Sequence, residues 1–250
     1  MALTANTIAK HNFSKKLYNA LMTGDREKVI QLCRKTPEGP LHILTIHQDT
    51  ALHMATYSKQ KDLVLSLLQE LTEGQFAKLM HPNDTGNTIL HEAATSDRIV
   101  PAAREMLIKA PKLLSMRNRR GETALFRAAR YGKTMMFEFL DDETNKSIKN
   151  AEELKAFHYR DDKTTILHMS ILTEHFDLAL VIASKYEYLL DEKDGDGMTA
   201  LQLLACNPSA FKKGRTQGFF KRFIYPYEAK GLSKKSTLYH PMFAWFFFGL

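Results

Sequence analysis

The stretch that decides the fold is DTGNTILHEAA, residues 84–94. It places His91 beside Glu92, a pair that also occurs in the zinc-binding helix of metallohydrolases. Such a helix needs a second histidine four residues after the first, so that both imidazoles face the metal. Position 95 is Thr95. The sequence therefore predicts no metal site here, and the stretch needs another interpretation.

Variants of this stretch occur five times at similar intervals. The aligned threonines have spacings of 38, 35, 42 and 34 residues: Thr50, Thr88, Thr123, Thr165 and Thr199. Three copies have a histidine three residues later (His53, His91 and His168), whereas Phe126 and Gln202 stand there in the others. Recurrence at a fixed period of about 20–50 residues indicates a repeat architecture.

Each unit reads as a helical hairpin. The threonine hydroxyl can cap the start of a short helix, and turn residues with glycine precede it, as in residues 83–86, 118–121 and 194–197. A second, apolar helix follows, for example around Leu63 and Leu67. One hairpin cannot bury its apolar face alone, so we expect the units to stack.

This pattern resembles the ankyrin repeat, whose motif T-P-L-H-x-A recurs in units of about 33 residues; Ala or Ile replaces the Pro here. The resemblance implies an all-α ankyrin-repeat solenoid of about six helix-hairpin units with short turn fingers. It covers residues 14–207, between an N-terminal segment (1–13) and a C-terminal tail (208–250). The aligned threonines are expected to be structural, as are His53, His91 and His168, which are expected to bond backbone between turns and so tie one repeat to the next.

Two parts of the chain depart from the pattern. Residues 16–33 read as helix, Gly-Asp turn and helix, but they lack the Thr-Leu-His motif, as capping repeats often do. The long spacing before Thr165 implies an insertion. The polar stretch 141–155 is expected to form a protruding loop or an extra helical turn.

The resemblance also implies where a partner protein binds. Residues just before the threonine, and at the end of the first helix, are expected to contact it on the concave face. Arg and Tyr are favoured at interfaces, and the fourth unit is the richest in them; a solvated basic face is the alternative interpretation. The candidates are Tyr57, Asn87, Thr95, Arg119, Arg120, Arg127, Arg130 and Tyr131, with Asp49, Ser96, Glu122 and Thr173 at equivalent positions.

Charge separates the body of the chain from its tail. Of 35 Lys/Arg and 28 Asp/Glu, residues 212–250 hold eight and one, which leaves 27 of each in residues 1–211. A neutral body argues against nucleic acid as a partner. The two cysteines, Cys33 and Cys206, are too few for a disulfide scaffold, and we expect them to be small core residues in a reducing compartment.

No pattern indicates catalysis, a cofactor or a metal. Residues 192–197 resemble part of a calcium loop, but the twelfth position is Leu203, where the loop needs a glutamate. Neither GxGxxG nor GxxxxGK[ST] occurs. We therefore expect a non-enzymatic protein.

The basic, aromatic tail has three interpretations. Residues 212–235 could lie on an anionic bilayer, stack on nucleic acid, or form a linker whose aromatic side chains pack on the last repeat. No secretory signal is visible, and no run reaches the roughly 18 apolar residues that span a bilayer.

A narrower resemblance rests on the first unit, LYNALMTGD at residues 17–25, and on units reading DxxGxTxLHxAA. Both are similar to the plant ankyrin proteins that carry a C-terminal membrane domain opened by Pro-Gly-Gly. This resemblance implies a role in defence, cell-death or salt-stress signalling, with the repeats in the cytosol. The chain has no Pro-Gly-Gly and is expected to end inside the linker, as a fragment or shortened form would.

We thus expect a protein–protein interaction module in the cytoplasm or at the inner face of the plasma membrane. The alternative is a peripheral membrane signalling component attached through residues 212–235.

Overall fold

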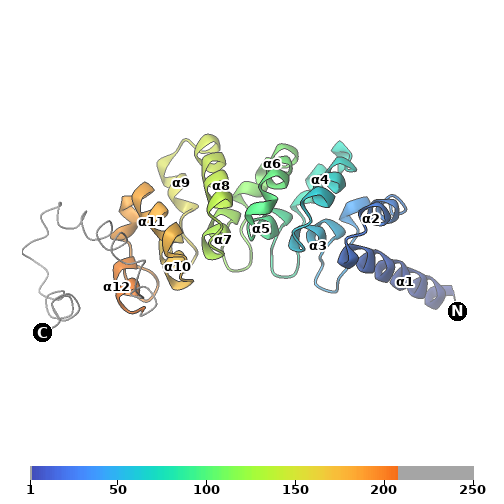
Figure 1. Ribbon diagram of the computed structural model, residues 1–250, viewed down its shortest axis with the longest axis horizontal. Helices are drawn as coiled ribbons and strands as arrows, with labels where there is room; N and C mark the ends of the chain where they lie inside the picture. Colours follow the sequence, from blue (N-terminus) through green and yellow to red (C-terminus); the bar gives the residue numbers. More distant parts are fainter. Residues whose placement is uncertain (1, 208–250) are drawn as a thin grey trace, which may run out of the picture.

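The computed structural model describes residues 2–207 of the 250-residue chain, with side chains described from residue 9 onward. The tail expected at 208–250, including the basic segment 212–235, lies outside the described residues. The helices form successive antiparallel hairpins that stack along one axis (Figure 1). The hairpins are α1 (Ala2–Thr23) with α2 (Arg26–Cys33), α3 (Ala51–Tyr57) with α4 (Lys61–Gln69), α5 (Ile89–Ala93) with α6 (Val100–Lys109), α7 (Ala124–Arg130) with α8 (Thr134–Ser147), and α10 (Ile166–Leu172) with α11 (Phe176–Lys185).

The first helices of the hairpins form an inner row and the second helices an outer row (Figure 1). A further helix, α12 (Ala200–Ala205), continues the inner row. The inner helices approach closely because the side chains between them are small: Ala93, Ala94, Ala128 and Ala129 are fully buried. One apolar core runs through all the hairpins. The expected all-α stack is therefore confirmed, since each hairpin buries its apolar face against its neighbours.

Short 3₁₀ helices follow most outer helices and lead the chain back to the next turn. They are η1 (Gly39–Leu41), η2 (Glu73–Met80), η4 (Pro111–Ser115) and η5 (Glu187–Leu190), while η3 (Asp97–Ile99) precedes α6. Antiparallel bridges outside named strands close three of the turn fingers, for example between Ile43 and Thr50. Adjacent fingers touch. Gly86 has a φ of +78°, and a Cβ built there would lie 2.5 Å from the backbone nitrogen of Arg119.

The first hairpin contains the expected helix, Gly-Asp turn and helix. Gly24 adopts a φ of +70°, and the side chain of Asp25 accepts a hydrogen bond from the backbone N–H of Lys28, which caps α2. Helix α1 starts at Ala2 and runs through the boundary expected at residues 13 and 14. Its buried face consists of Leu17, Ala20 and Leu21.

The insertion forms helix rather than a protruding loop. Helix α8 continues to Ser147, and α9 (Ala151–Ala156) follows it. The helical alternative is the one observed, and Asp141, the first residue of the stretch, is fully buried inside α8. The expected core role of the cysteines also needs one correction, because Cys33 is buried whereas Cys206 at the end of α12 is exposed.

Within residues 2–207, no helix combines the length and the apolar character that crossing a bilayer requires.

Candidate partner-binding face

The aligned threonines start the inner helices. The hydroxyl oxygen of Thr50 accepts from the backbone N–H of His53 at 3.2 Å, and that of Thr123 accepts from Phe126 at 3.2 Å. In return, the Nδ1 atom of His91 accepts from the backbone N–H of Thr88 at 3.1 Å. The threonine and the residue three positions later thus pair two backbone N–H groups that the start of a helix would otherwise leave without a partner.

The histidines also reach the next repeat. The Nε2 atom of His53 lies 3.3 Å from the carbonyl oxygen of Asn87. The equivalent distance is 2.9 Å for His91 and Glu122, and 3.0 Å for His168 and Met198. Burial lowers the pKa of His53 and of His91 to about 4, so both rings are neutral at pH 7. Each histidine therefore makes the inter-repeat contact expected of it.

The fourth unit lacks the hydrogen bond from a histidine to the next repeat and makes a different contact. Phe126 is fully buried and has no ring nitrogen to offer. Arg117, just before the finger, instead donates to the backbone oxygens of Tyr159 (3.0 Å) and Ala156 (2.6 Å) in the following unit. The missing histidine is visible in the sequence, but nothing there indicates that Arg117 makes the contact between the units.

A polar network joins the third and fourth units across the inner face. The amide of Asn118 donates to Asn87 at 2.9 Å, and Asn87 donates to the carboxylate of Glu92 at 2.9 Å. Arg127 donates to the same carboxylate at 3.3 Å and to the backbone oxygen of His91 at 2.8 Å. Glu92 has 7% of its side chain exposed. This network holds the inner helices in register.

A second carboxylate continues the network. Glu122 is almost fully buried, with 1% of its side chain exposed, and it forms an ion pair with Arg130. Arg160 from the next finger lies 3.7 Å from Glu122 and forms a further ion pair with Asp162. Two of the four arginines expected at an interface, Arg127 and Arg130, therefore neutralise buried acids of their own chain.

The candidate residues thus fall into two classes. Asn87, Arg127, Arg130 and Glu122 take part in the network. Tyr57 and Tyr131 remain 64% and 41% exposed, and Arg119 and Arg120 are exposed as well. Thr95 and the equivalent Ser96, Thr173 and Asp49 are partly exposed.

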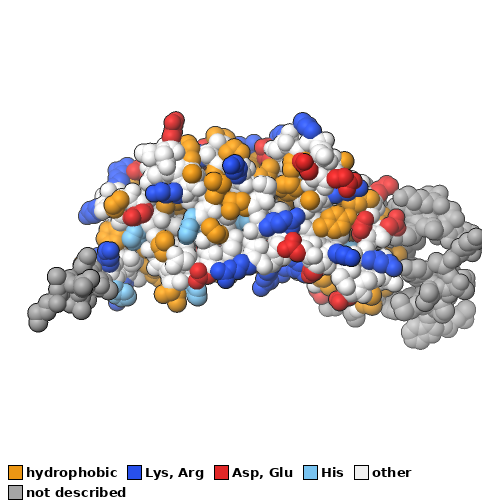
Figure 2. Space-filling view, turned by 180° about the vertical axis from the view of Figure 1, so that it is seen from behind, with side chains coloured by type: hydrophobic (Ala, Val, Ile, Leu, Met, Phe, Trp, Pro, Cys, Tyr) orange, Lys and Arg blue, Asp and Glu red, His pale blue; other side chains and the backbone are white. Residues whose placement is uncertain are grey.

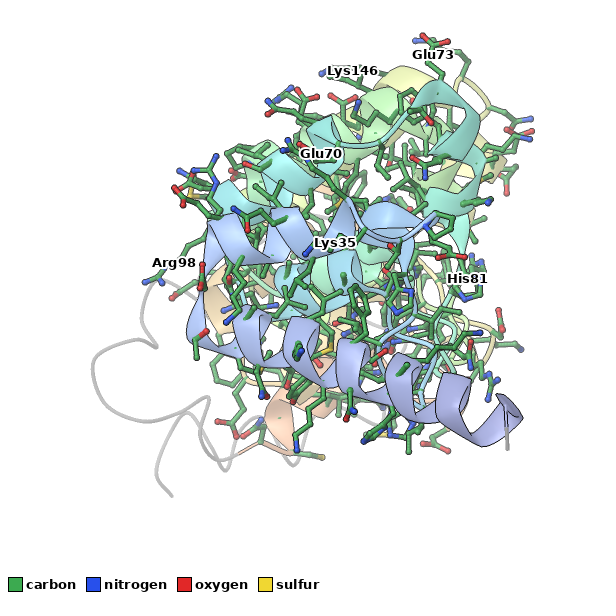
Figure 3. All side chains as sticks on the ribbon, turned by 90° about the vertical axis from the view of Figure 1, so that its right-hand side faces the viewer. Lys35, Glu70, Glu73, His81, Arg98 and Lys146 are labelled. Carbon is green, nitrogen blue, oxygen red and sulfur yellow. The ribbon has the colours of Figure 1, made fainter. Side chains whose placement is uncertain are left out.

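The exposed candidates lie at two different edges of the face. Figure 3 looks along the stack and shows His81, where the chain enters a finger, opposite Arg98, which lies in the turn between α5 and α6. Arg119 and Arg120 belong to the finger edge, whereas Tyr57 and Tyr131 belong to the turn edge. An inner helix of seven residues separates the edges by about 10 Å. The cluster expected in the fourth unit is therefore divided.

Two lysines at the turn edge had not been singled out from the sequence. Lys59 and Lys133 follow α3 and α7, nine and ten residues after the aligned threonines. Lys59 adopts a φ of +59°, and its Nζ donates to the backbone oxygen of Glu92 at 3.3 Å and to the hydroxyl of Thr95. The available signal was their recurrence at nearly the same position in two units.

No group of three or more His, Cys, Asp and Glu side chains placed to hold a metal ion occurs in the part of the chain that the structure describes. The residues of the face offer hydrogen bonds, positive charge and aromatic area.

A search of solved structures finds a match titled "Crystal Structure of EF0377 an Ankyrin Repeat Protein". The TM-score is 0.60 at 18% sequence identity, and the match covers 84% of this chain and 96% of that chain. The chain has the ankyrin-repeat fold. At this identity the likeness concerns the fold, and function has to be argued from the residues. A scan against protein-family models and a search of curated proteins each found no match.

Proposed function

We propose that the chain is a non-enzymatic scaffold that binds another protein through the inner face of its ankyrin-repeat stack. The observation that carries this proposal is the network beneath the exposed residues, in which the buried acids Glu92 and Glu122 are paired with arginines of the same chain. Because Glu92 and Glu122 already fix the arginines around them, Tyr57, Tyr131 and the finger arginines stand on a rigid support. A preformed surface spends little conformational entropy on binding.

A capture experiment with the full chain tests this proposal. The variant Arg119→Glu with Arg120→Glu, combined with Tyr57→Ala and Tyr131→Ala, is expected to lose partner proteins that the wild type retains. The control variant reverses two exposed lysines elsewhere, Lys112→Glu with Lys149→Glu, and is expected to retain them. Circular dichroism would establish that all variants keep the wild-type helix content and melting temperature. Unchanged capture by the quadruple variant would contradict the proposal.

We further propose, from the similarity of the repeats to plant ankyrin proteins, that this scaffold works in defence or stress signalling in the cytoplasm or at the inner face of the plasma membrane. Partners recovered by proximity labelling in plant cells would test this role. Partners unrelated to such signalling would argue against it.

A second candidate function is peripheral membrane attachment through residues 212–235. Its support is the excess of eight basic residues over one acid in residues 212–250, interleaved with aromatic residues. Flotation with anionic liposomes, with and without residues 212–250, tests it. If both forms remain in solution, this candidate is eliminated.

A further inference from the structure

The turn edge contains a continuous set of cationic and aromatic side chains, which we call the turn strip. It is defined as Tyr57, Lys59, Thr95, Arg127, Tyr131 and Lys133. Lys59 Nζ lies 5.6 Å from the centre of the Tyr57 ring and donates to Thr95 in the next unit. The guanidinium of Arg127 lies 5.3 Å from the centre of the Tyr131 ring. Two cation–π pairs therefore stand at the two ends of one strip across three repeats.

The positive charge of the turn strip is under-compensated. Glu92 is the carboxylate at its centre, and Arg127 and Asn87 already bond to it. Among the described residues, neither Lys59 nor Lys133 has a carboxylate in ion-pair contact, although both remain partly exposed. Figure 2 shows one face of the stack, on which Lys and Arg side chains recur with Asp and Glu side chains between them.

The protonation of Lys59 reflects this crowding. Burial lowers the pKa of Lys59 to about 8, and the positive charges of Arg127 and Lys133 lower it too, against the opposing effect of Glu92. A carboxylate placed beside Lys59 would favour the charged ammonium and so raise the pKa again.

The two tyrosines determine which kind of anion fits. Tyr57 and Tyr131 expose ring area in the second and fourth units, and Lys59 donates to Thr95 of the unit between them, so the complementary ligand is apolar at both ends and acidic in between. They lie two units apart, which is roughly 16–20 Å at the usual spacing of packed helices. An extended chain covers that distance in about five or six residues. Proteins supply such a ligand readily, whereas a uniform phosphate backbone or a lipid surface does not have this pattern.

We propose that the turn strip binds an acidic, extended segment of a partner protein in which two apolar side chains flank a short run of carboxylates. The apolar side chains pack on Tyr57 and Tyr131, and the carboxylates face Lys59 and Lys133. This inference rests on the proposed scaffold function and specifies the partner chemistry at one edge of the same face.

Fluorescence anisotropy with the full chain tests it. The probe is a labelled peptide with two Leu residues six positions apart and Asp/Glu between them; the control peptide carries Asn/Gln at the acidic positions. We expect the acidic peptide to bind at least tenfold more tightly, and its affinity to fall as salt screens the charges. Lys59→Gln with Lys133→Gln should lower the affinity for the acidic peptide at least tenfold. Tyr57→Ala with Tyr131→Ala should lower the affinity for both peptides.

The control variant, Lys112→Gln with Lys149→Gln, removes the same charge from exposed lysines away from the binding face, and it should bind the acidic peptide like the wild type. Equal binding of the acidic and neutral peptides, or no effect of the lysine variant, overturns the inference. So does preferential binding of anionic vesicles or of single-stranded DNA through the same lysines. If captured partners depend on Arg119 and Arg120 while the lysine variant retains them, the scaffold function stands and only this inference fails.

Discussion

Replacing His91 with Ala should destabilise the stack at its centre. The side chain is fully buried, and its ring joins the backbone N–H of Thr88 at 3.1 Å to the backbone oxygen of Glu122 at 2.9 Å. Because Nδ1 accepts, Nε2 must carry the proton and donate. Alanine leaves one donor and one acceptor unpaired, each at about 1–3 kcal/mol, so we expect a loss of about 2–6 kcal/mol in the free energy of unfolding.

The same residue makes stability depend on pH. The folded pKa of His91 is about 4, below the ordinary value of about 6.5, because burial disfavours the imidazolium. The unfolded chain therefore binds a proton first as the pH falls. The stabilisation is complete above pH 6.5 and is lost between pH 6.5 and 4, by about 3 kcal/mol at about 1.4 kcal/mol per pH unit.

Urea unfolding followed by circular dichroism at pH 7 and pH 5 measures both effects. His91→Gln is the matched variant, because Gln202 shows that a glutamine oxygen can accept from the backbone N–H of the capping threonine, at 2.8 Å from Thr199. We expect stability at pH 7 to decrease from wild type to His91→Gln to His91→Ala, and the acid-induced loss to be smaller in both variants. Equal stability of wild type and His91→Ala at pH 7 would refute the reasoning.

Three further predictions concern the second half of the stack. Asp141→Asn should lower the melting temperature at pH 7, because the buried carboxylate accepts a hydrogen bond from the Tyr186 hydroxyl at 2.6 Å. Burial raises the pKa of Asp141, but the hydrogen bonds to its carboxylate outweigh this effect and lower the pKa below its ordinary value. The difference in melting temperature between wild type and variant should therefore shrink as the pH falls below about 4. Arg117→Gln should cost about 1–3 kcal/mol in urea unfolding, since its donors satisfy backbone oxygens of the next unit, and an unchanged midpoint would contradict this role. Gly132→Ala should lower the melting temperature, because φ is +61° and a Cβ would lie 2.4 Å from the ring of His175; an unchanged value would show that the ring moves away freely.

The repeat could be predicted from the sequence because its determinants are local. The capping contact of Thr50 and His53 joins residues three apart, and the apolar spacing of α4 lies within one helix. Both leave a periodic signal in the chain. The inter-repeat contact of His53 was predictable in kind, since a buried ring nitrogen needs a partner.

The polar network was not predictable in the same way. Arg127 donates to the carboxylate of Glu92, 35 residues earlier in the chain. Arg130 forms an ion pair with the buried side chain of Glu122, which lies just before its own helix. Whether an arginine faces a partner or neutralises an acid of its own chain depends on which side chains stacking brings opposite it. Composition alone does not separate the two cases, because exposed and internally paired arginines look identical in a sequence.

Two irregularities of the sequence, the missing histidine at Phe126 and the insertion before Thr165, prove to belong to one junction. Without a ring nitrogen, the fourth unit cannot bond to the fifth as its neighbours do, and Arg117 donates instead to the backbone oxygens of Ala156 and Tyr159, just after the insertion. In the outer row, Asp141 is buried, and two residues of the fifth unit contact its carboxylate. They are Lys185 at the end of α11 and Tyr186 directly after it. A polar bond to the next repeat is therefore retained at this junction, although the residues that make it are different. The requirement in such a stack is that each unit bonds to the next, and the sequence motif is one way to meet it.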